Sequence, residues 1–388
     1  RQTLSVDAGA RLQFGRYADQ IQQRELEQSA VQSPFISADY SRETRANRFA
    51  LSARYQERDN GLEEIDLVDA ESLIVDQGTR SDMRLGATLQ LGRTAPLSFT
   101  GNVEYSERRY FDTTDPDLTD QDFYRLRTEF GLRLTPTARL TFETAYFERD
   151  EYDPEDTLEV NRLARLGFNM DVRPGLTASA SAGYQIDETT RTVNGRRVTD
   201  TQEEPVLSFS LRQARQDGAI TLSGSQRVTE AGSRTSLTVG RSLDLPRAEL
   251  SASLGVSVND DYGVNGIGSL TYRQPLPRGR FEVSFNQRVA TDDDDDTLFT
   301  STSFSYTHTI SRLSSIGLSV DLAATQSLED DGTDRQRARA SVTWSRSVTE
   351  DWRFNAGYRH STARETDEDP IIENSVFAHL SRSFDLRP

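Results

Sequence analysis

Cysteine is absent from the 388-residue chain, and histidine occurs only three times. Without cysteine the chain forms neither a disulfide nor a thiolate metal site. We therefore expect no cofactor and no cysteine-based metal centre. An excess of basic residues is missing too, because 62 acidic and 45 basic residues give a formal net charge of −17. This balance argues against nucleic acid as a partner, since phosphate binding requires a basic surface.

Long apolar runs are also missing. No segment approaches the roughly 18–20 consecutive apolar residues that a membrane-spanning helix needs. This excludes a helical membrane protein but leaves a transmembrane β-barrel open, because each barrel strand shows only about ten residues of alternating hydrophobicity. A hydrophobic content of only 35% would also suit a disordered chain. The apolar residues, however, recur in an order that disorder does not require.

That order is an apolar residue at every second position. The stretch "LTASASAGYQID" (residues 176–187) alternates Leu, Ala, Tyr and Ile with Thr, Ser, Gly, Gln and Asp. Successive side chains of a strand point to opposite faces, so the pattern predicts one apolar face and one polar face. The pattern recurs along the chain, as in "RFALSARYQ" and "LSFTGNVEY". Including the weak segment "FISADY" (residues 35–40), we count about twenty strands, with 18 as the alternative.

The connectors between these segments alternate in length. Tight ones such as "ETRAN", "RPG" and "DLPR" take turns with longer, acidic ones such as "RDEYDPEDT", "DETTRTVNGRRVTDTQEE" and "TDDDDDT". A strand, a tight turn, a strand and a long loop are the repeating unit of an antiparallel meander. Strict alternation puts all tight turns at one rim and all long loops at the other, as in outer-membrane barrels with short periplasmic turns.

The two patterns together predict an all-β fold, a transmembrane up-and-down antiparallel barrel formed by residues 1–388 as a single domain. Lipid covers the apolar face, and in hydrocarbon every backbone polar group must be paired, so the sheet must close. A soluble propeller or sandwich would bury both faces of its inner strands and would show continuous apolar runs.

The chain opens on "RQTLSVDAGARLQF" without a signal peptide, so we expect a mature, processed sequence. Alternation begins near Leu4, leaving no room for a plug domain, and we expect a lumen that is open or blocked by another molecule.

The final segment "SVFAHLSRSF" resembles the assembly signal of Gram-negative outer-membrane barrels, in which alternating apolar residues end in an aromatic one. Leu380 and Phe384 carry this resemblance, although the chain continues with "DLRP" beyond the aromatic residue. Within this class, the chain is similar over its whole length to the porin-like barrels that accompany exopolysaccharide export, including the beta-barrel porin 2 family. The likeness lies in pattern and composition. It implies location in the bacterial outer membrane and insertion by the barrel-assembly machinery.

Charged residues with the parity of the polar face would line the lumen. One interpretation is a hydrated conduit in which these charges select among polar solutes. The alternative is that they solvate the wall and pair across strands. The candidates are Arg125, Arg127, Glu129, Arg133, Glu143, Arg149, Arg165, Asp171, Arg212, Glu282, Arg288, Asp321, Arg339, Arg353 and Arg359.

Aromatic residues near the strand ends share the parity of the apolar face. Amphipathic rings prefer the membrane interfaces, so we expect an aromatic girdle. Stacking of sugars inside the lumen is the rival interpretation, and it requires rings of the opposite parity. The girdle candidates are Tyr55, Tyr105, Tyr146, Tyr184, Tyr272, Tyr306, Trp344, Trp352 and Tyr358.

The acidic run "DDDDD" (residues 292–296) raises the question of calcium. Carboxylates suit hard cations, and Asp292, Asp294 and Asp296 are the candidate ligands. The spacing does not match an EF-hand, so a solvated run facing the cell exterior is the favoured interpretation. Divalent cations could also bridge such loops to lipopolysaccharide phosphates. An enzyme has little support: His308 and His360 have lipid-face parity, and only His379 points inward.

Two functions remain. The first is an outer-membrane channel, porin-like, that passes polar solutes or a secreted polysaccharide without chemistry. The second is a structural or docking barrel whose lumen holds a periplasmic export protein or a lipoprotein. In both cases the expected surroundings are outer-membrane lipid and lipopolysaccharide.

Overall fold

The computed structural model consists of strands. It describes residues 2–13, 16–19, 24–27, 30–59, 78–113, 118–229, 232–259, 263–292, 295–328, 334–349, 351–366 and 369–384. Over these ranges no helix is long and apolar enough to cross a membrane.

The strands follow the predicted alternation closely and extend it at several ends. Their bounds are β1 (Gln2–Gln13), β2 (Arg16–Asp19), β3 (Arg24–Glu27), β4 (Ala30–Glu43), β5 (Arg48–Asp59), β6 (Thr79–Leu91), β7 (Leu97–Phe111), β8 (Gln121–Thr135), β9 (Ala138–Glu151), β10 (Thr157–Arg173), β11 (Leu176–Val193), β12 (Arg196–Arg215), β13 (Gly218–Thr229), β14 (Gly232–Leu245), β15 (Ala248–Asn259), β16 (Gly263–Leu276), β17 (Gly279–Asp292), β18 (Asp295–Ser311), β19 (Ser314–Ser327), β20 (Arg335–Ser347), β21 (Trp352–Glu365) and β22 (Ile371–Phe384).

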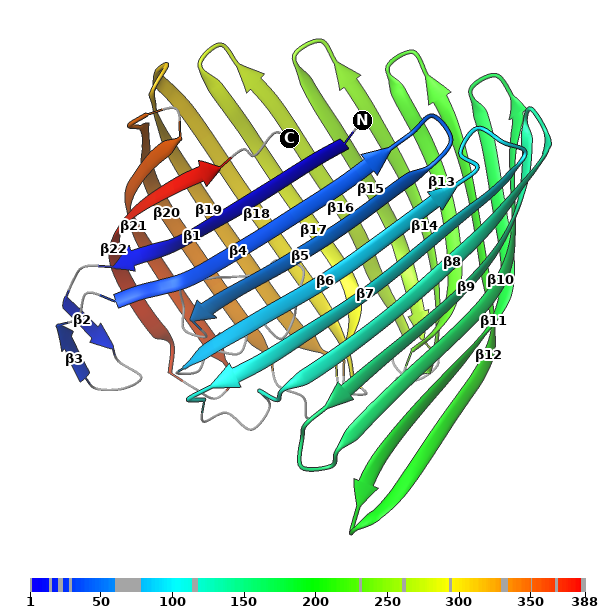
Figure 1. Cartoon of the computed structure of the whole chain (residues 1–388), viewed down its shortest axis with the longest axis horizontal. Helices are drawn as coiled ribbons and strands as arrows, with labels where there is room; N and C mark the ends of the chain where they lie inside the picture. The colour runs from blue at the N-terminus through cyan, green and yellow to red at the C-terminus, as the bar shows by residue number, and fades with distance from the viewer. Residues whose placement is uncertain are drawn as a thin grey trace.

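Twenty of these strands form one antiparallel sheet, as the count from alternation predicted (Figure 1). Strands β4 to β22 each pair with the next along the chain, while β1 pairs with β4 and also with β22. The β1–β22 seam is short and consists of three residue pairs, from Val6 opposite Phe384 to Ala8 opposite Arg382. The first and last strands of the meander therefore meet, but over a small part of their length.

Strands β2 and β3 form a separate two-stranded sheet that the alternation did not predict. The weak segment at residues 35–40 lies inside β4 and pairs with both β1 and β5, so it is a full member of the large sheet.

The turns separate into two rims, as predicted. One rim carries short connections, such as residues 136–137, 174–175 and 216–217. These form the upper edge of the sheet in Figure 1, and the alternate connections lie at the opposite edge. The predicted difference in length holds only in part: β7 ends at Phe111 and β8 begins at Gln121, but β17 ends at Asp292 and β18 already begins at Asp295. We call the two edges the turn rim and the loop rim.

The loop prediction for "DETTRTVNGRRVTDTQEE" is wrong. These residues continue β11 and β12 as a paired hairpin whose turn is Asn194–Gly195, and this hairpin projects beyond the loop rim in Figure 1. Asn194 has φ 53° and Gly195 has φ 73°. Two successive positive φ values with the sequence Asn-Gly are typical of a tight hairpin turn whose twist matches that of the strands.

The outer face of the sheet is apolar. Leu254, Val376 and Leu166 are 77%, 70% and 55% exposed, and the other large exposed hydrophobic residues on the strands share their parity almost throughout. A soluble protein rarely exposes so extensive an apolar surface. The surface is therefore the one that lipid would cover.

The inner face is polar, but it is not uniformly open. In the half of β18–β22 next to the loop rim, inward side chains such as Phe299, Arg337, Ser361 and Ser375 are between 0% and 4% exposed. On the same strands nearer the turn rim, inward residues such as Ser305 are exposed. The expectation of a lumen free of the chain itself therefore fails at the loop rim, where the chain buries its own inner wall.

Candidate functional site

The candidate site is the inner face of the sheet, because all the predicted lumen-lining residues share that face by strand register. Their role in selectivity stays a prediction. What the structure adds is that most of these residues form ion pairs, some with one another and others with charged residues outside the predicted set.

Glu143 on β9 lies at the centre of one such group. The Arg127 Nε on β8 is 2.8 Å from one carboxylate oxygen, and the Arg165 Nη2 on β10 is 2.8 Å from the other. Register explains the meeting, because Glu143 is directly opposite Arg165, and Arg127 lies two residues along β8 from the position opposite Glu143. Glu143 is 7% exposed and is shared by two cations, so the group carries a net positive charge.

Further cross-strand pairs follow the same logic on both halves of the sheet. Arg339 is 2.9 Å from Asp321, and Arg125 is 3.2 Å from Glu104. Glu282 accepts from Arg273 on the neighbouring strand β16 at 2.8 Å and also from Arg280 on its own strand at 2.6 Å.

Sequence reasoning missed several of these partners, namely Glu104, Arg139, Arg273 and Arg280. Glu104, Arg273 and Arg139, the partner of Glu129, have inner-face parity on a strand next to that of the predicted residue, so parity combined with pairing order would have found them. Arg280 lies two positions before Glu282 on the same strand, so parity alone would have found it. The pairing interpretation is therefore supported, since many of these inner-face residues pair across strands, while selection among solutes stays a prediction.

The remaining predicted residues have varied surroundings. The Arg288 guanidinium lies 4.3 Å from the centre of the Phe299 ring, and Arg359 lies 5.1 Å from that of Phe377. Arg149 is 3.3 Å from Glu159. By contrast, the inward residues Arg212 and Arg353 near the turn rim are exposed.

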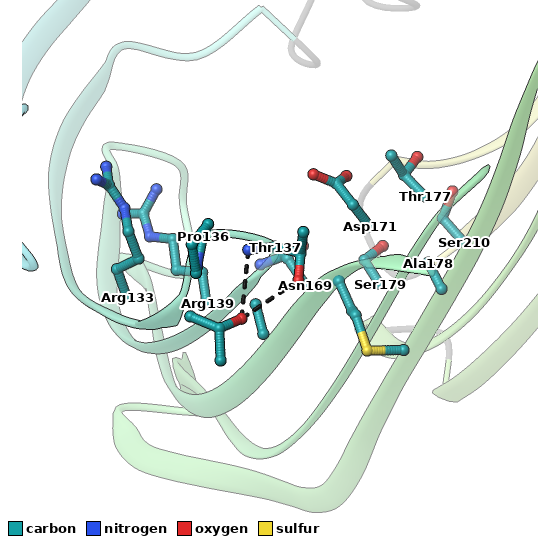
Figure 2. A pocket seen from close by; sticks show the side chains of 13 residues that line it. Arg133, Pro136, Thr137, Arg139, Asn169, Asp171, Thr177, Ala178, Ser179 and Ser210 are labelled. Carbon is teal, nitrogen blue, oxygen red and sulfur yellow. Dashed lines mark hydrogen bonds between the residues drawn. The ribbon is translucent and has the colours of Figure 1, made fainter. Parts of the chain in front are cut away.

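A cavity of about 380 Å³ lies at the turn rim, between the β8–β9 and β10–β11 turns (Figure 2). Figure 2 shows Arg133 and Arg139 on one side of it and Asp171, Thr177 and Ser210 on the other. This places the predicted residues Arg133 and Asp171 at one small polar recess. Both signs of charge and several hydroxyls suit a hydrated polar solute.

The Arg139 guanidinium at this recess is held in place by two hydrogen bonds. Its Nη2 donates to Glu129 Oε1 at 2.9 Å and to Ser98 Oγ at 3.0 Å. Gly131 makes this possible, because a Cβ there would stand 2.2 Å from Arg139 Nη2.

The aromatic candidates all lie on the outer face, in two groups. Trp344 and Trp352 mark the turn rim, where Trp344 contacts Phe354 edge to face at 6.0 Å, and Tyr306 is stacked with His308 at 6.3 Å. Tyr358 is on β21, and its hydroxyl donates to Asn374 at 2.6 Å. Tyr272 contacts Phe281 at 5.9 Å.

Towards the loop rim, tyrosine hydroxyls donate to glutamates on the same outer face. Tyr55 donates to Glu57 at 2.5 Å and Tyr105 to Glu107 at 3.1 Å. Tyr146 donates to Glu148, and Tyr184 donates across strands to Glu203 at 3.1 Å. The spacing Tyr-x-Glu recurs in "YQE", "YSE" and "YFE". It could have predicted these hydrogen bonds, because residues two apart on a strand lie on the same face.

Tyr152 extends this band into the β9–β10 loop. Its hydroxyl donates to Asp122 Oδ2 at 3.0 Å, and this hydrogen bond raises the pKa of the Tyr152 phenol. A tyrosine that combines a ring on the outer face with a hydroxyl bonded to a carboxylate has the amphipathic character that membrane interfaces favour, and the girdle stays a prediction.

The calcium hypothesis finds no support among the described residues, where no three metal-binding side chains gather. The side chains of Asp292 and Asp294 lie outside the described set. The prediction of a solvated run is wrong at Asp296, which is fully buried. Its carboxylate accepts hydrogen bonds from Arg234 and from Asn259, the latter at 2.9 Å.

The two histidines whose side chains the structure describes form no recognisable catalytic group. His308 stacks on Tyr306, and the His360 Nδ1 lies 2.9 Å from Asn374 Oδ1 on the outer face. The side chains of His379 and Phe384 lie outside the described residues, whereas Leu380 is 43% exposed on the outer face.

Solved structures of outer-membrane transport receptors share this fold. The FrpB iron transporter from Neisseria meningitidis (F5-1 variant) is 9% identical with a TM-score of 0.64, covering 98% of this chain and 77% of its own. The ferric-catecholate import receptor Fiu from E. coli K12 is 10% identical with a TM-score of 0.62, over 99% and 77%. The siderophore receptor PirA from Pseudomonas aeruginosa is 9% identical with a TM-score of 0.52, over 99% and 80%.

No protein-family model matches this sequence, and no curated protein is detectably similar to it. The structural likeness therefore shows the fold alone, an antiparallel up-and-down sheet of the kind found in outer-membrane barrels. Together with the apolar outer face, this fold supports the predicted location in the bacterial outer membrane.

Proposed function

We propose that this chain forms a channel across the outer membrane, in which the polar inner face conducts hydrated polar solutes or a secreted polysaccharide. The observation that carries the proposal is the division of one sheet into an apolar outer face and an inner face of paired charges. A membrane barrel needs the first, and a water-filled passage needs the second.

The proposal includes complete closure of the sheet in the membrane. An unpaired strand edge in hydrocarbon leaves backbone polar groups without partners, at a cost of several kcal/mol each. The β1–β22 seam supplies the first three residue pairs of that closure. A sheet of twenty strands is wide enough for an aqueous interior.

The similar structures support transport in general and leave the solute open. Those proteins are named for iron, siderophores and ferric catecholates, whereas the wall of this chain presents mixed, paired charges and the hydroxyl-rich recess of Figure 2. Such a wall favours hydrated solutes with many hydroxyl groups, and it supplies no obvious chemistry for transforming them. An unreactive passage therefore accounts for the site better than an enzyme does.

Reconstitution in planar lipid bilayers tests the proposal. We expect stable single-channel steps from the folded chain and none from the same preparation after heat denaturation. Uptake of sugars into liposomes gives a second readout that does not depend on ions. A folded protein that inserts but conducts neither ions nor sugars would contradict the proposal.

The buried inner wall at the loop rim favours one second candidate. A barrel filled on one side could serve as a dock for a periplasmic export protein or a lipoprotein, with no conduction of its own. A silent barrel that copurifies with one stoichiometric partner would support this function.

A further inference from the structure

Arg234 and Asp296 make a contact that the strand order does not predict. Arg234 is at the loop-rim end of β14, and Asp296 is at the loop-rim end of β18. The Arg234 Nη2 donates to Asp296 Oδ1, and Arg234 Nη1 donates to the Val289 carbonyl oxygen at 3.1 Å. On β15, Asn259 Nδ2 donates to Asp296 Oδ2 at 2.9 Å.

These residues are too far apart along the wall to meet by register. Strands β15, β16 and β17 separate β14 from β18, which corresponds to about 19 Å at about 4.8 Å per strand. An arginine side chain does not span that distance. The loop-rim ends of β14 and β15 and those of β17 and β18 must therefore approach each other, and the inner-face parity of Arg234 and Asn259 puts the contact on the inside of the sheet.

Burial agrees with this geometry. Asp296 is 0%, Arg234 3% and Asn259 4% exposed, although Arg234 and Asn259 carry inner-face parity at the rim of the sheet. Ser257, one inward position deeper on β15, is 3% exposed. Ser253, two inward positions deeper still, is half-buried, so the cover over the wall is local to the rim.

We propose that the cluster of Arg234, Asn259 and Asp296 holds the loop-rim end of β17 and β18 inside the lumen, where it narrows the passage and limits the size of the solute. The limit on solute size rests on the proposed channel function, whereas the placement of the β17–β18 end does not depend on it. Breaking a buried ion pair leaves one charge uncompensated, which strongly favours release of the segment.

Accessibility of a single cysteine tests the geometry directly, because the chain has no cysteine of its own. Ser257→Cys is the reporter, and Ser253→Cys on the same face of β15 is the matched control. Each is combined with Asp296→Ala, or with Asn259→Ala as a milder change, in the full chain refolded into liposomes. A water-soluble maleimide then measures the labelling rate.

We expect Asp296→Ala to raise labelling of the Ser257→Cys reporter by about tenfold, and Asn259→Ala by less, with the Ser253→Cys control unchanged. Heat-modifiable electrophoretic mobility verifies that each variant still folds. Equal labelling of the reporter with and without Asp296→Ala would overturn the proposal, as would an equal rise at both cysteine positions.

Conductance separates this proposal from the channel function. If the parent chain conducts, Asp296→Ala should enlarge its single-channel steps, and unchanged steps would contradict the constriction. If neither chain conducts while reporter labelling rises, the channel function fails and the placement of the β17–β18 end stands.

Discussion

At the residue scale, shared carboxylates set the charge of the inner wall. Glu143 forms ion pairs with both Arg127 and Arg165. Removal of its charge would therefore leave both arginines without the carboxylate that neutralises them. We expect Glu143→Gln to shift the channel towards anion selectivity, measured as the reversal potential in a salt gradient. Glu203→Gln is the control, because Glu203 has the same chemistry on the outer face. An equal shift in both variants would show that the inner pairs do not control selectivity.

The outer face yields a second prediction at this scale. Leu254 is 77% exposed near the middle of β15, where lipid is its expected environment. Arginine at the bilayer midplane costs about 2–4 kcal/mol, so Leu254→Arg should lower the free energy of unfolding in lipid by that amount. Ser251→Arg, on the opposite face of the same strand, should change it little. Chemical denaturation of the refolded barrel in liposomes measures both, and equal effects would refute the assignment of faces.

Parity predicted which face each of these residues occupies, because a strand leaves only two choices. It did not predict the ion-pair partners, since these depend on register between strands as well as on parity. Arg139 illustrates the point: it reaches Glu129 and Ser98 only because Gly131 leaves room for its guanidinium. These contacts involve residues on three neighbouring strands, so the pattern of one strand alone cannot predict them.

At the scale of elements, the β11–β12 hairpin shows where composition misled the prediction. Its outer half is rich in Thr, Glu, Asp and Arg, which resembles a solvated loop. Outside the membrane a strand needs no apolar face, so alternation disappears while the pairing continues. The Asn-Gly turn was the surviving signal, and its geometry is that of a tight hairpin.

The same turn provides a prediction. Gly195 has φ 73°, a conformation that strains any residue with a side chain. No neighbouring atom lies within 4 Å of the point where a Cβ would stand, so a substitution there would strain the backbone without a steric clash. We expect Gly195→Val to fray the tip and to make the folded barrel sensitive to trypsin at Arg196 and Arg197, which should resist cleavage in the parent chain. Gly266→Val is the control, because Gly266 has the same free space without a positive φ. Equal resistance of the Gly195 variant and the parent would show that the turn does not hold the tip.

At the scale of the whole molecule, the β1–β22 seam is the shortest strand pairing in the large sheet. Only three residue pairs join β1 to β22, and all involve residues 382–384 of β22. Removing residues 382–388 should therefore abolish the compact, heat-modifiable form on electrophoresis. Removing only residues 385–388 keeps all three pairs and should preserve it. Compact barrels from both truncations would mean that the seam is dispensable.

The strand number and the two rims could be predicted from the sequence, because both follow from local patterns of alternation and turn length. The buried inner wall could not. It depends on contacts such as Arg234 with Asp296, between strands that are not neighbours, and neither parity nor connector length encodes them. Asp296 belongs to an acidic run with the composition of a solvated loop, yet its own side chain is fully buried.

The projecting part of β12 has a further consequence for how copies of this protein meet in a crowded membrane. Among the described residues, 196–206 of β12 pair with β11 alone, because the pairing with β13 begins at Leu207. An open strand border of this kind invites a second chain to add its own strand, and native proteins discourage that with charge and proline. Arg196, Arg197, Asp200, Glu203, Glu204 and Pro205 occupy this border. The hairpin can thus stand outside the wall without becoming a seed for chain-to-chain association.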